Sequence, residues 1–198
     1  MKLAQVLRQA IFLPCLGIFV ITGCTHTISP PKDAFTGYTQ QEKIRLKVGL
    51  NMTEELRQAK WERHLMGDTW VIPIGESLTQ NSATLARHMF AEVVDVSSSI
   101  RGPNANVDAI LTPKLAFINR TMGSTSVGQS IIAVKMEWDL TALDGKPIWV
   151  ETVSGEASGS TGWTDPEKVL KQAIETLLRK SQQAMASSDA IRRFAARR

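Results

Sequence analysis

The feature that most constrains the fold is an alternation of apolar and polar side chains along residues 131–140. The apolar members are Ile132, Val134, Met136, Trp138 and Leu140, and the residues between them are Ala133, Lys135, Glu137 and Asp139. A period of two residues predicts a β-strand with one face in a hydrophobic core and the other in water. The chain is therefore expected to contain a sheet that is covered on one side.

Four more segments have strand character, at about residues 43–51, 70–74, 107–119 and 148–157. The first of them alternates as cleanly as 131–140. Pro73 favours an edge position or an early end for the second, because proline cannot donate to a strand ladder. Asp144-Gly145 has the chemistry of a hairpin turn between 131–140 and 148–157, since glycine tolerates a positive φ.

Three segments are predicted to be helical. Thr53 is suited to cap a short helix that runs towards His64, and residues 81–94 place apolar side chains at helical spacing. A long helix is expected to begin at Asp165-Pro166, an N-cap followed by proline in the first turn. The apolar line of that helix is Val169, Leu170, Ala173, Ile174, Leu177 and Leu178. Residues 95–106 and 122–129 are rich in turn-forming residues and are predicted to be loops.

These elements predict an α+β fold, a two-layer sandwich in which a mixed sheet of about five strands carries helices on one face. We assign residues 43–186 to this single domain. Residues 187–198 are rich in arginine. They are predicted to form a basic, frayed C-terminal tail, either a solubilising end or a contact for a membrane surface or a partner.

The amino terminus has the parts of an export signal. Lys2 and Arg8 precede an apolar stretch at about residues 11–21, which is shorter than the roughly 20 apolar residues that a bilayer-spanning helix needs. The stretch ends in Ile21-Thr22-Gly23-Cys24, which resembles the lipobox of bacterial lipoproteins. This resemblance implies that residues 1–23 are a signal peptide, that cleavage falls between Gly23 and Cys24, and that Cys24 is acylated. The alternative is an ordinary export signal with a chance cysteine.

Two or three acyl chains on Cys24 would anchor the protein stably, since each buried CH2 contributes about 0.8 kcal/mol and a single chain binds only marginally. Apart from this covalent lipid, palmitate or a similar acyl chain, we expect no cofactor. In Gram-negative lipoproteins, Asp after the cysteine favours retention in the inner membrane. Thr25 stands there instead, so the resemblance implies an outer-membrane location facing the periplasm. Residues 24–42 are predicted to be a flexible tether.

Charge argues against nucleic acid as a partner. The chain has 23 Lys and Arg against 19 Asp and Glu, and loss of Lys2 and Arg8 leaves 21 against 19. Lys43, Arg45 and Lys47 nevertheless project from one side of the first strand and form a candidate surface for a partner or for anionic headgroups. Lys114 and Lys135 could extend it, whereas an ordinary solvated face is the alternative interpretation. Trp163 is a candidate exposed contact, and Trp138 is predicted to be core.

Catalytic and metal-binding patterns are not evident in the sequence. The histidines of the mature chain, His26, His64 and His88, are isolated and have no cysteine partner, so we expect no metal site. Residues 123–130 have the glycine spacing of a phosphate loop, but Gln129 stands where such a loop needs lysine. Because no Gly-x-Ser-x-Gly motif is present, we assign no catalytic residues. With Cys15 in the signal and Cys24 acylated, no disulfide is expected.

The region of about residues 107–178 resembles envelope lipoprotein domains of the LpoB, CsgG and TolB amino-terminal type. The resemblance rests on Val107-Asp108-Ala109-Ile110-Leu111, on the turn Asp144-Gly145-Lys146 and on Ile148-Trp149-Val150. It implies a non-enzymatic outer-membrane lipoprotein that binds or regulates a cell-envelope protein. Two alternatives stay open: an accessory lipoprotein of lipid or lipopolysaccharide transport, and a periplasmic enzyme, which the lack of paired catalytic groups disfavours.

Overall fold

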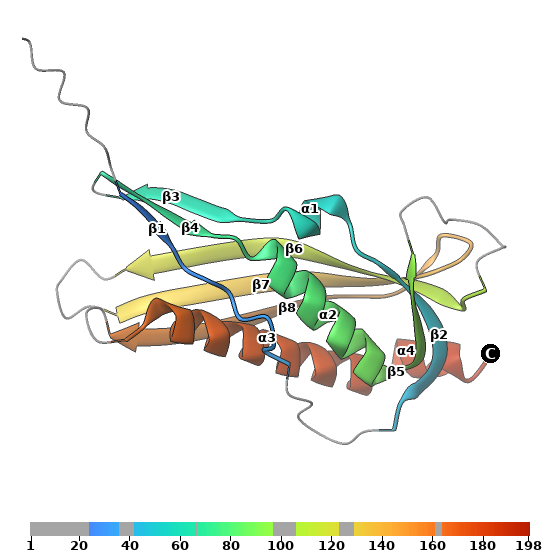
Figure 1. Cartoon of the computed structure of the whole chain (residues 1–198). Helices are drawn as coiled ribbons and strands as arrows, with labels where there is room; N and C mark the ends of the chain where they lie inside the picture. Colours follow the sequence, from blue (N-terminus) through green and yellow to red (C-terminus); the bar gives the residue numbers. More distant parts are fainter. Residues whose placement is uncertain (1–23, 36–41, 66, 97–105, 123–128, 161–163) are drawn as a thin grey trace, which may run out of the picture.

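The computed structural model describes residues 24–35, 42–65, 67–96, 106–122, 129–160 and 164–198. Its centre is a five-stranded mixed sheet with the strand order β5-β2-β6-β7-β8 (Figure 1). The strands are β2 (Ile44–Asn51), β5 (Phe90–Val96), β6 (Ala109–Met122), β7 (Gln129–Ala142) and β8 (Pro147–Ser160). β2 pairs in parallel with both β5 and β6, whereas β6, β7 and β8 form an antiparallel meander.

Two helices, α2 (Gly75–Met89) and α3 (Pro166–Ser187), cover one face of this sheet (Figure 1). The inward side chains of β7 are those that the alternation predicted, and all of them are fully buried. The predicted apolar line of α3 is buried as well, and Asp165 caps the helix by accepting a hydrogen bond from the Glu167 N–H. Trp138 lies in the core and donates its indole N–H to Ser181 Oγ at 2.9 Å. The predicted α+β architecture, with helices on one face of a five-stranded mixed sheet, is confirmed. The fifth strand differs from the prediction, because β5 takes the place expected for residues 70–74, and most of that segment pairs in a second sheet.

The contact between α3 and β8 is especially close. Gly155 lies directly under the helix, and a Cβ atom at this position would overlap the backbone oxygen of Ala173 and approach Leu177. The predicted hairpin turn joins β7 to β8, with Gly145 at a φ of 84°. Its N–H donates to the Ala142 carbonyl at 2.9 Å. Glycine is therefore required at one position for space and at the other for backbone conformation.

A second, three-stranded sheet was not predicted. It has the order β1-β4-β3 and comprises β1 (Thr25–Thr27), β4 (Asp68–Ile72) and β3 (Trp61–Leu65). The prediction of a flexible tether over residues 24–42 is therefore wrong for residues 24–35, and residues 36–41 lie outside the described residues. Ile28 and Ala34 are fully buried. Asn81 Oδ1 accepts from the backbone N–H groups of Ala34 (2.8 Å) and Phe35 (3.0 Å), so these contacts hold the segment on the domain.

Two of the predicted helices have different bounds in the structure. The helix capped by Thr53, α1 (Glu54–Arg57), ends well before His64, because residues 61–65 form β3 instead. The helix predicted at 81–94 begins earlier, at Gly75, and ends at Met89. Phe90 to Val96 forms β5, where pairing with β2 and two adjacent valines favour extended backbone over helix.

The C-terminal segment is ordered rather than frayed. Helix α4 (Asp189–Ala195) follows α3, and its N-cap Ser188 accepts a hydrogen bond from the Ile191 N–H. Ile191 is fully buried in the core, which explains why the prediction of a solvated tail over residues 187–198 is wrong. One buried aliphatic side chain contributes about 1.5–3 kcal/mol, enough to hold a short capped helix on the domain.

Candidate functional site

Cys24 is exposed at the start of β1, and its backbone is fixed to the domain. Its N–H donates to Asp68 Oδ1 at 3.1 Å, and its carbonyl accepts from the Thr69 N–H at 2.9 Å. The next residue, Thr25, already pairs with Thr69 in the parallel ladder between β1 and β4. A group attached to the Cys24 sulfur would therefore be joined directly to folded structure.

An aromatic stack reinforces this end of the molecule. The rings of His26 and Trp70 are stacked with their centroids 4.4 Å apart, and His26 Nε2 lies 3.2 Å from Asp68 Oδ2. The guanidinium of Arg120, from the far part of β6, also lies 4.4 Å from the centroid of a Trp70 ring. Burial lowers the pKa of Arg120, and contact with the aromatic ring is one way to stabilise a partly desolvated cation. The stack thus ties the small sheet to the large one beside Cys24.

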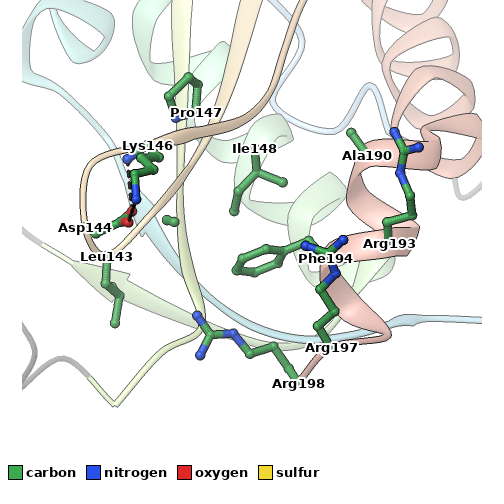
Figure 2. Close-up of a pocket in the computed structure, with 11 residues that line it drawn as sticks. Leu143, Asp144, Lys146, Pro147, Ile148, Ala190, Arg193, Phe194, Arg197 and Arg198 are labelled. Atoms are coloured by element: carbon green, nitrogen blue, oxygen red, sulfur yellow. Dashed lines mark hydrogen bonds and ion pairs between the residues drawn. The ribbon is translucent and has the colours of Figure 1, made fainter.

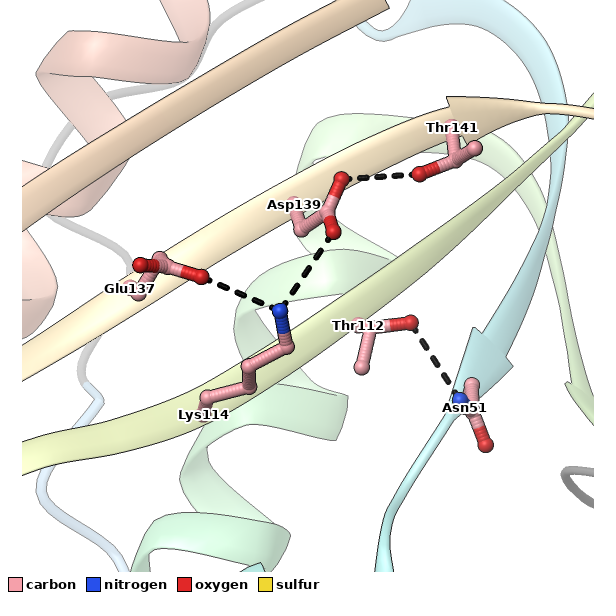
Figure 3. A network of polar contacts seen from close by, with 6 residues as sticks. All are labelled: Asn51, Thr112, Lys114, Glu137, Asp139 and Thr141. Carbon is pink, nitrogen blue, oxygen red and sulfur yellow. Dashed lines mark hydrogen bonds and ion pairs between the residues drawn. The ribbon is translucent and has the colours of Figure 1, made fainter. Parts of the chain in front are cut away.

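The open face of the large sheet carries a compensated polar network (Figure 3). Lys114 Nζ lies 3.0 Å from Glu137 Oε1 and 3.4 Å from Asp139 Oδ2. The hydrogen bond with Glu137 is the largest cause of the raised pKa of Lys114. Thr141 donates to Asp139 at 2.7 Å, so both acids are bound to neighbours on the sheet. Lys114 therefore does not extend the basic surface predicted from the sequence.

The predicted basic strand residues are only partly free. Arg45 pairs with Glu42 at 3.2 Å, and Lys47 pairs with Glu92 of the neighbouring strand at 2.7 Å. Lys43 is exposed and has no ion pair with any described residue. Two of the three cations are therefore compensated by a neighbouring carboxylate, and within the described part of the chain only Lys43 is not. Their role in binding a partner or headgroups stays a prediction, and Gly23 and Trp163 lie outside the described residues.

A groove lies at the other end of the meander, between the β7–β8 turn and α4 (Figure 2). Its volume is about 680 Å³. Apolar atoms come from Leu143, Pro147, Ile148, Ala190 and Phe194, and the cations are Lys146, Arg193, Arg197 and Arg198. Phe194 is half-buried against the core, and the Arg198 guanidinium lies 5.1 Å from the centroid of its ring. We call this region the C-terminal groove.

The charges of the C-terminal groove are unbalanced. Its single acid, Asp144, is bound by Lys146, whose Nζ lies 2.8 Å from Asp144 Oδ2. That hydrogen bond is the largest cause of the lowered pKa of Asp144 and of the raised pKa of Lys146. Arg193, Arg197 and Arg198 have no ion pair within the described part of the chain. The groove therefore presents three uncompensated guanidinium groups around an apolar floor.

Cys24 and the C-terminal groove lie at opposite ends of the large sheet. Arg120, which contacts Trp70 beside Cys24, hydrogen-bonds Ser130 near the start of β7. Ala142, at the other end of β7, lines the groove. The strand has 14 residues, which at about 3.3 Å per residue span roughly 45 Å. Figure 1 shows the same separation, with α4 and the chain end far from β1.

Sequence reasoning did not identify the residues that build these two ends. Asp68, Trp70 and Arg120 contact the Cys24 segment only through strand pairings between distant parts of the chain. For the arginines of the groove, the sequence predicts a frayed tail. Ser188 followed by Asp189 was the available signal, because a serine N-cap with an acid in the first turn marks the beginning of a helix.

None of the described helices is long and apolar enough to cross a membrane. Within the described ranges, no group of three or more His, Cys, Asp or Glu side chains is placed to hold a metal ion.

No family model and no curated protein matches the chain. Among solved structures, protein XCC0632 from Xanthomonas campestris has a TM-score of 0.51 and 11% sequence identity, covering 81% of this chain and 91% of its own. A minor lipoprotein from Acinetobacter baumannii has a TM-score of 0.46 and 7% identity, covering 74% of this chain and 94% of its own. The likeness to the Xanthomonas protein shows a shared fold.

Proposed function

We propose that the protein is a lipoprotein anchored by acyl chains on Cys24 to the periplasmic face of the outer membrane, where it binds or regulates an envelope protein without enzymatic activity. The observation that carries this proposal is the exposed Cys24 at the start of folded structure, directly after a lipobox-like run. Its backbone N–H is held by Asp68. Cleavage before Cys24 would leave that nitrogen in place as an amide or an ammonium, and a carboxylate can accept from either.

A direct junction between lipid and domain has a mechanical consequence. With β1 beginning one residue after the cysteine, the domain has little freedom to rotate on its anchor. Its long axis along β7 would then carry the C-terminal groove away from the membrane that holds the lipid. The alternative of a lipid-transport accessory depended on the basic strand, two of whose three cations are ion-paired.

Mass spectrometry of the mature amino terminus tests the anchor. We expect a chain that begins at Cys24 and carries acyl groups, and Cys24→Ser should abolish both the modification and membrane association. Cys15→Ser is the matched control, because this cysteine lies in the predicted signal and should leave both unchanged. An unmodified Cys24, or cleavage elsewhere, would contradict the proposal.

Membrane fractionation tests the location. Thr25 is exposed, so Thr25→Asp should be tolerated by the fold. It should nevertheless move the protein from the outer to the inner membrane fraction. The substitution Thr27→Asp, also exposed and on the same strand, should leave the protein in the outer membrane. A wild-type protein found in the inner-membrane fraction would exclude the outer-membrane part of the proposal.

A further inference from the structure

The C-terminal groove combines a concave shape with excess positive charge. Its volume of about 680 Å³ lies within the range of roughly 300–1,000 Å³ that small-molecule pockets have. A groove of this size accommodates a few side chains of an extended segment. A plane of headgroups, by contrast, would meet only its rim.

The lining specifies the chemistry of the occupant. Ile148 and the half-buried Phe194 offer apolar contact at the floor (Figure 2). Around them, Arg193 belongs to α4, whereas Arg197 and Arg198 follow directly after the end of this helix at Ala195. The three guanidinium groups carry the same charge and repel one another. Guanidinium groups bind carboxylates with two parallel hydrogen bonds, and arginine and aromatic residues are enriched where protein interfaces derive most of their affinity. A ligand with carboxylates on either side of an apolar side chain would satisfy both features.

Position decides between a protein segment and a lipid surface. This step rests on the proposed anchor at Cys24, from which the groove is separated by roughly the 45 Å length of β7. Electrostatic attraction to the headgroups of that membrane is screened within about 8 Å at physiological ionic strength. If β7 points away from the membrane, as proposed above, the anionic occupant comes from the side that faces away from the anchoring membrane.

We infer that the C-terminal groove is a docking site for an acidic, partly apolar segment of an envelope protein, bound by Arg193, Arg197 and Arg198 over Phe194. The inference specifies the partner chemistry of the proposed function. It does not require that Cys24 be acylated for the segment to bind.

Fluorescence anisotropy of the full chain in a neutral detergent tests the groove directly, with a labelled peptide of alternating Glu and Leu as the probe. We expect saturable binding that weakens with salt and falls about tenfold or more, a loss of at least 1.4 kcal/mol, when the three arginines are reversed to Glu. Phe194→Ala should weaken it several-fold. A probe with Gln in place of Glu should bind about tenfold more weakly than the acidic peptide.

The matched control reverses Lys168, Lys171 and Arg179, three exposed cations of α3. It changes the net charge of the chain by the same amount and should leave binding unchanged. Equal loss in both triple variants would overturn the inference, since attraction would then be general. Failure of the acidic peptide to bind the wild-type chain would overturn it as well.

Folding and partner class need separate readouts. Because Glu at a helix C-terminus opposes the helix dipole, a second variant replaces the three arginines with Gln and should also lose the acidic peptide. The variant with all three arginines reversed to Glu should instead gain binding to a peptide of alternating Lys and Leu.

Vesicles of phosphatidylglycerol provide the lipid comparison. If the arginine variants lose vesicle binding but keep peptide binding, the groove binds lipid and not a protein segment. If Cys24 is unmodified and the peptide still binds, the proposed lipid anchor is wrong but the proposed docking site in the C-terminal groove is not.

Discussion

The two faces of the meander formed by β6, β7 and β8 are built from the same strands but meet different surroundings. On the face under α3, every inward side chain of β7 from Ile132 to Leu140 is fully buried. On the open face, Lys114, Glu137 and Asp139 form an ion-pair network, and Phe117 and Val150 are about half exposed. Alternate residues of one strand therefore contribute very differently to the stability of the fold. On the covered face the contribution comes from apolar packing, and on the open face it comes from weak, screened ion pairs.

The largest effect is expected from a charge placed on the covered face. Ile174 of α3 is fully buried, so Ile174→Asp forces an unpaired carboxylate into the core and should destabilise the domain by about 3–5 kcal/mol. Lys171→Asp on the same helix replaces a long ion pair with Glu175 by an exposed like-charge pair, and should cost no more than about 1 kcal/mol. Urea denaturation measures both values, and equal midpoints would show that the helix is turned differently.

A smaller loss is expected where the covered face has no spare space. Gly155→Ala adds one carbon that would overlap the backbone of α3 at Ala173. The helix would have to shift, at a cost of about 1–3 kcal/mol, which is usual for overpacking. Ser154→Ala changes the adjacent residue on the open face and should stay within about 0.5 kcal/mol. Thermal unfolding of the two variants tests how closely α3 packs on β8. If Gly155→Ala has the same midpoint as Ser154→Ala, the helix lies farther from the strand than the structure shows.

The same contrast explains how much of the fold was predictable. The alternation at residues 131–140 has a period that only a one-sided strand produces, and the Asp165-Pro166 cap is local chemistry, so both were found in the sequence. By contrast, residues 24–35 are held by distant groups, such as the contact of Asn81 with the Ala34 backbone. Their polar composition resembles a spacer, because few side chains of the segment are buried, Ile28 and Ala34 among them, and the strand pairing of β1 and the buried amide of Asn81 supply the rest of the contact.

The candidate site was predictable in the same uneven way. Cys24 is predicted as an attachment point from a local pattern, and in the structure it is exposed; its acylation stays a prediction. The C-terminal groove could not be predicted from a local pattern. It forms where the β7–β8 turn meets α4, and neither segment alone indicates a concave surface. Local signals identify residues and caps, whereas a groove between segments requires the tertiary arrangement.

A modest effect is expected at the basic strand. Lys47→Glu would place a carboxylate opposite Glu92, its pairing partner in β5, and should cost about 1 kcal/mol. Arg45→Glu affects only an exposed pair and should cost a few tenths of a kcal/mol. The triple reversal of Lys43, Arg45 and Lys47 should therefore fold, with most of its loss due to Lys47. Binding of the triple variant to anionic vesicles at low salt measures any role in headgroup contact, which unchanged binding would exclude.

The smallest effect is expected from the Lys114 network on the open face. The pKa of Lys114 is raised, first by its hydrogen bond with Glu137. A raised folded-state pKa means that the pair stabilises the fold fully below the ordinary lysine pKa of about 10.4, and that this contribution is lost as the pH rises through the higher folded value.

Because the side chain of Lys114 is 46% exposed, the contribution of the pair to stability should not exceed about 1 kcal/mol. Urea denaturation should therefore separate wild type from Lys114→Met at roughly pH 8, and the difference between them should shrink as the pH rises beyond the ordinary lysine pKa of about 10.4. Lys135→Met, which removes an exposed cation of β7 without an ion pair among the described residues, should show no such convergence. A difference between wild type and Lys114→Met that persists at the alkaline pH would mean that the aliphatic part of Lys114, and not its charge, packs on the open face.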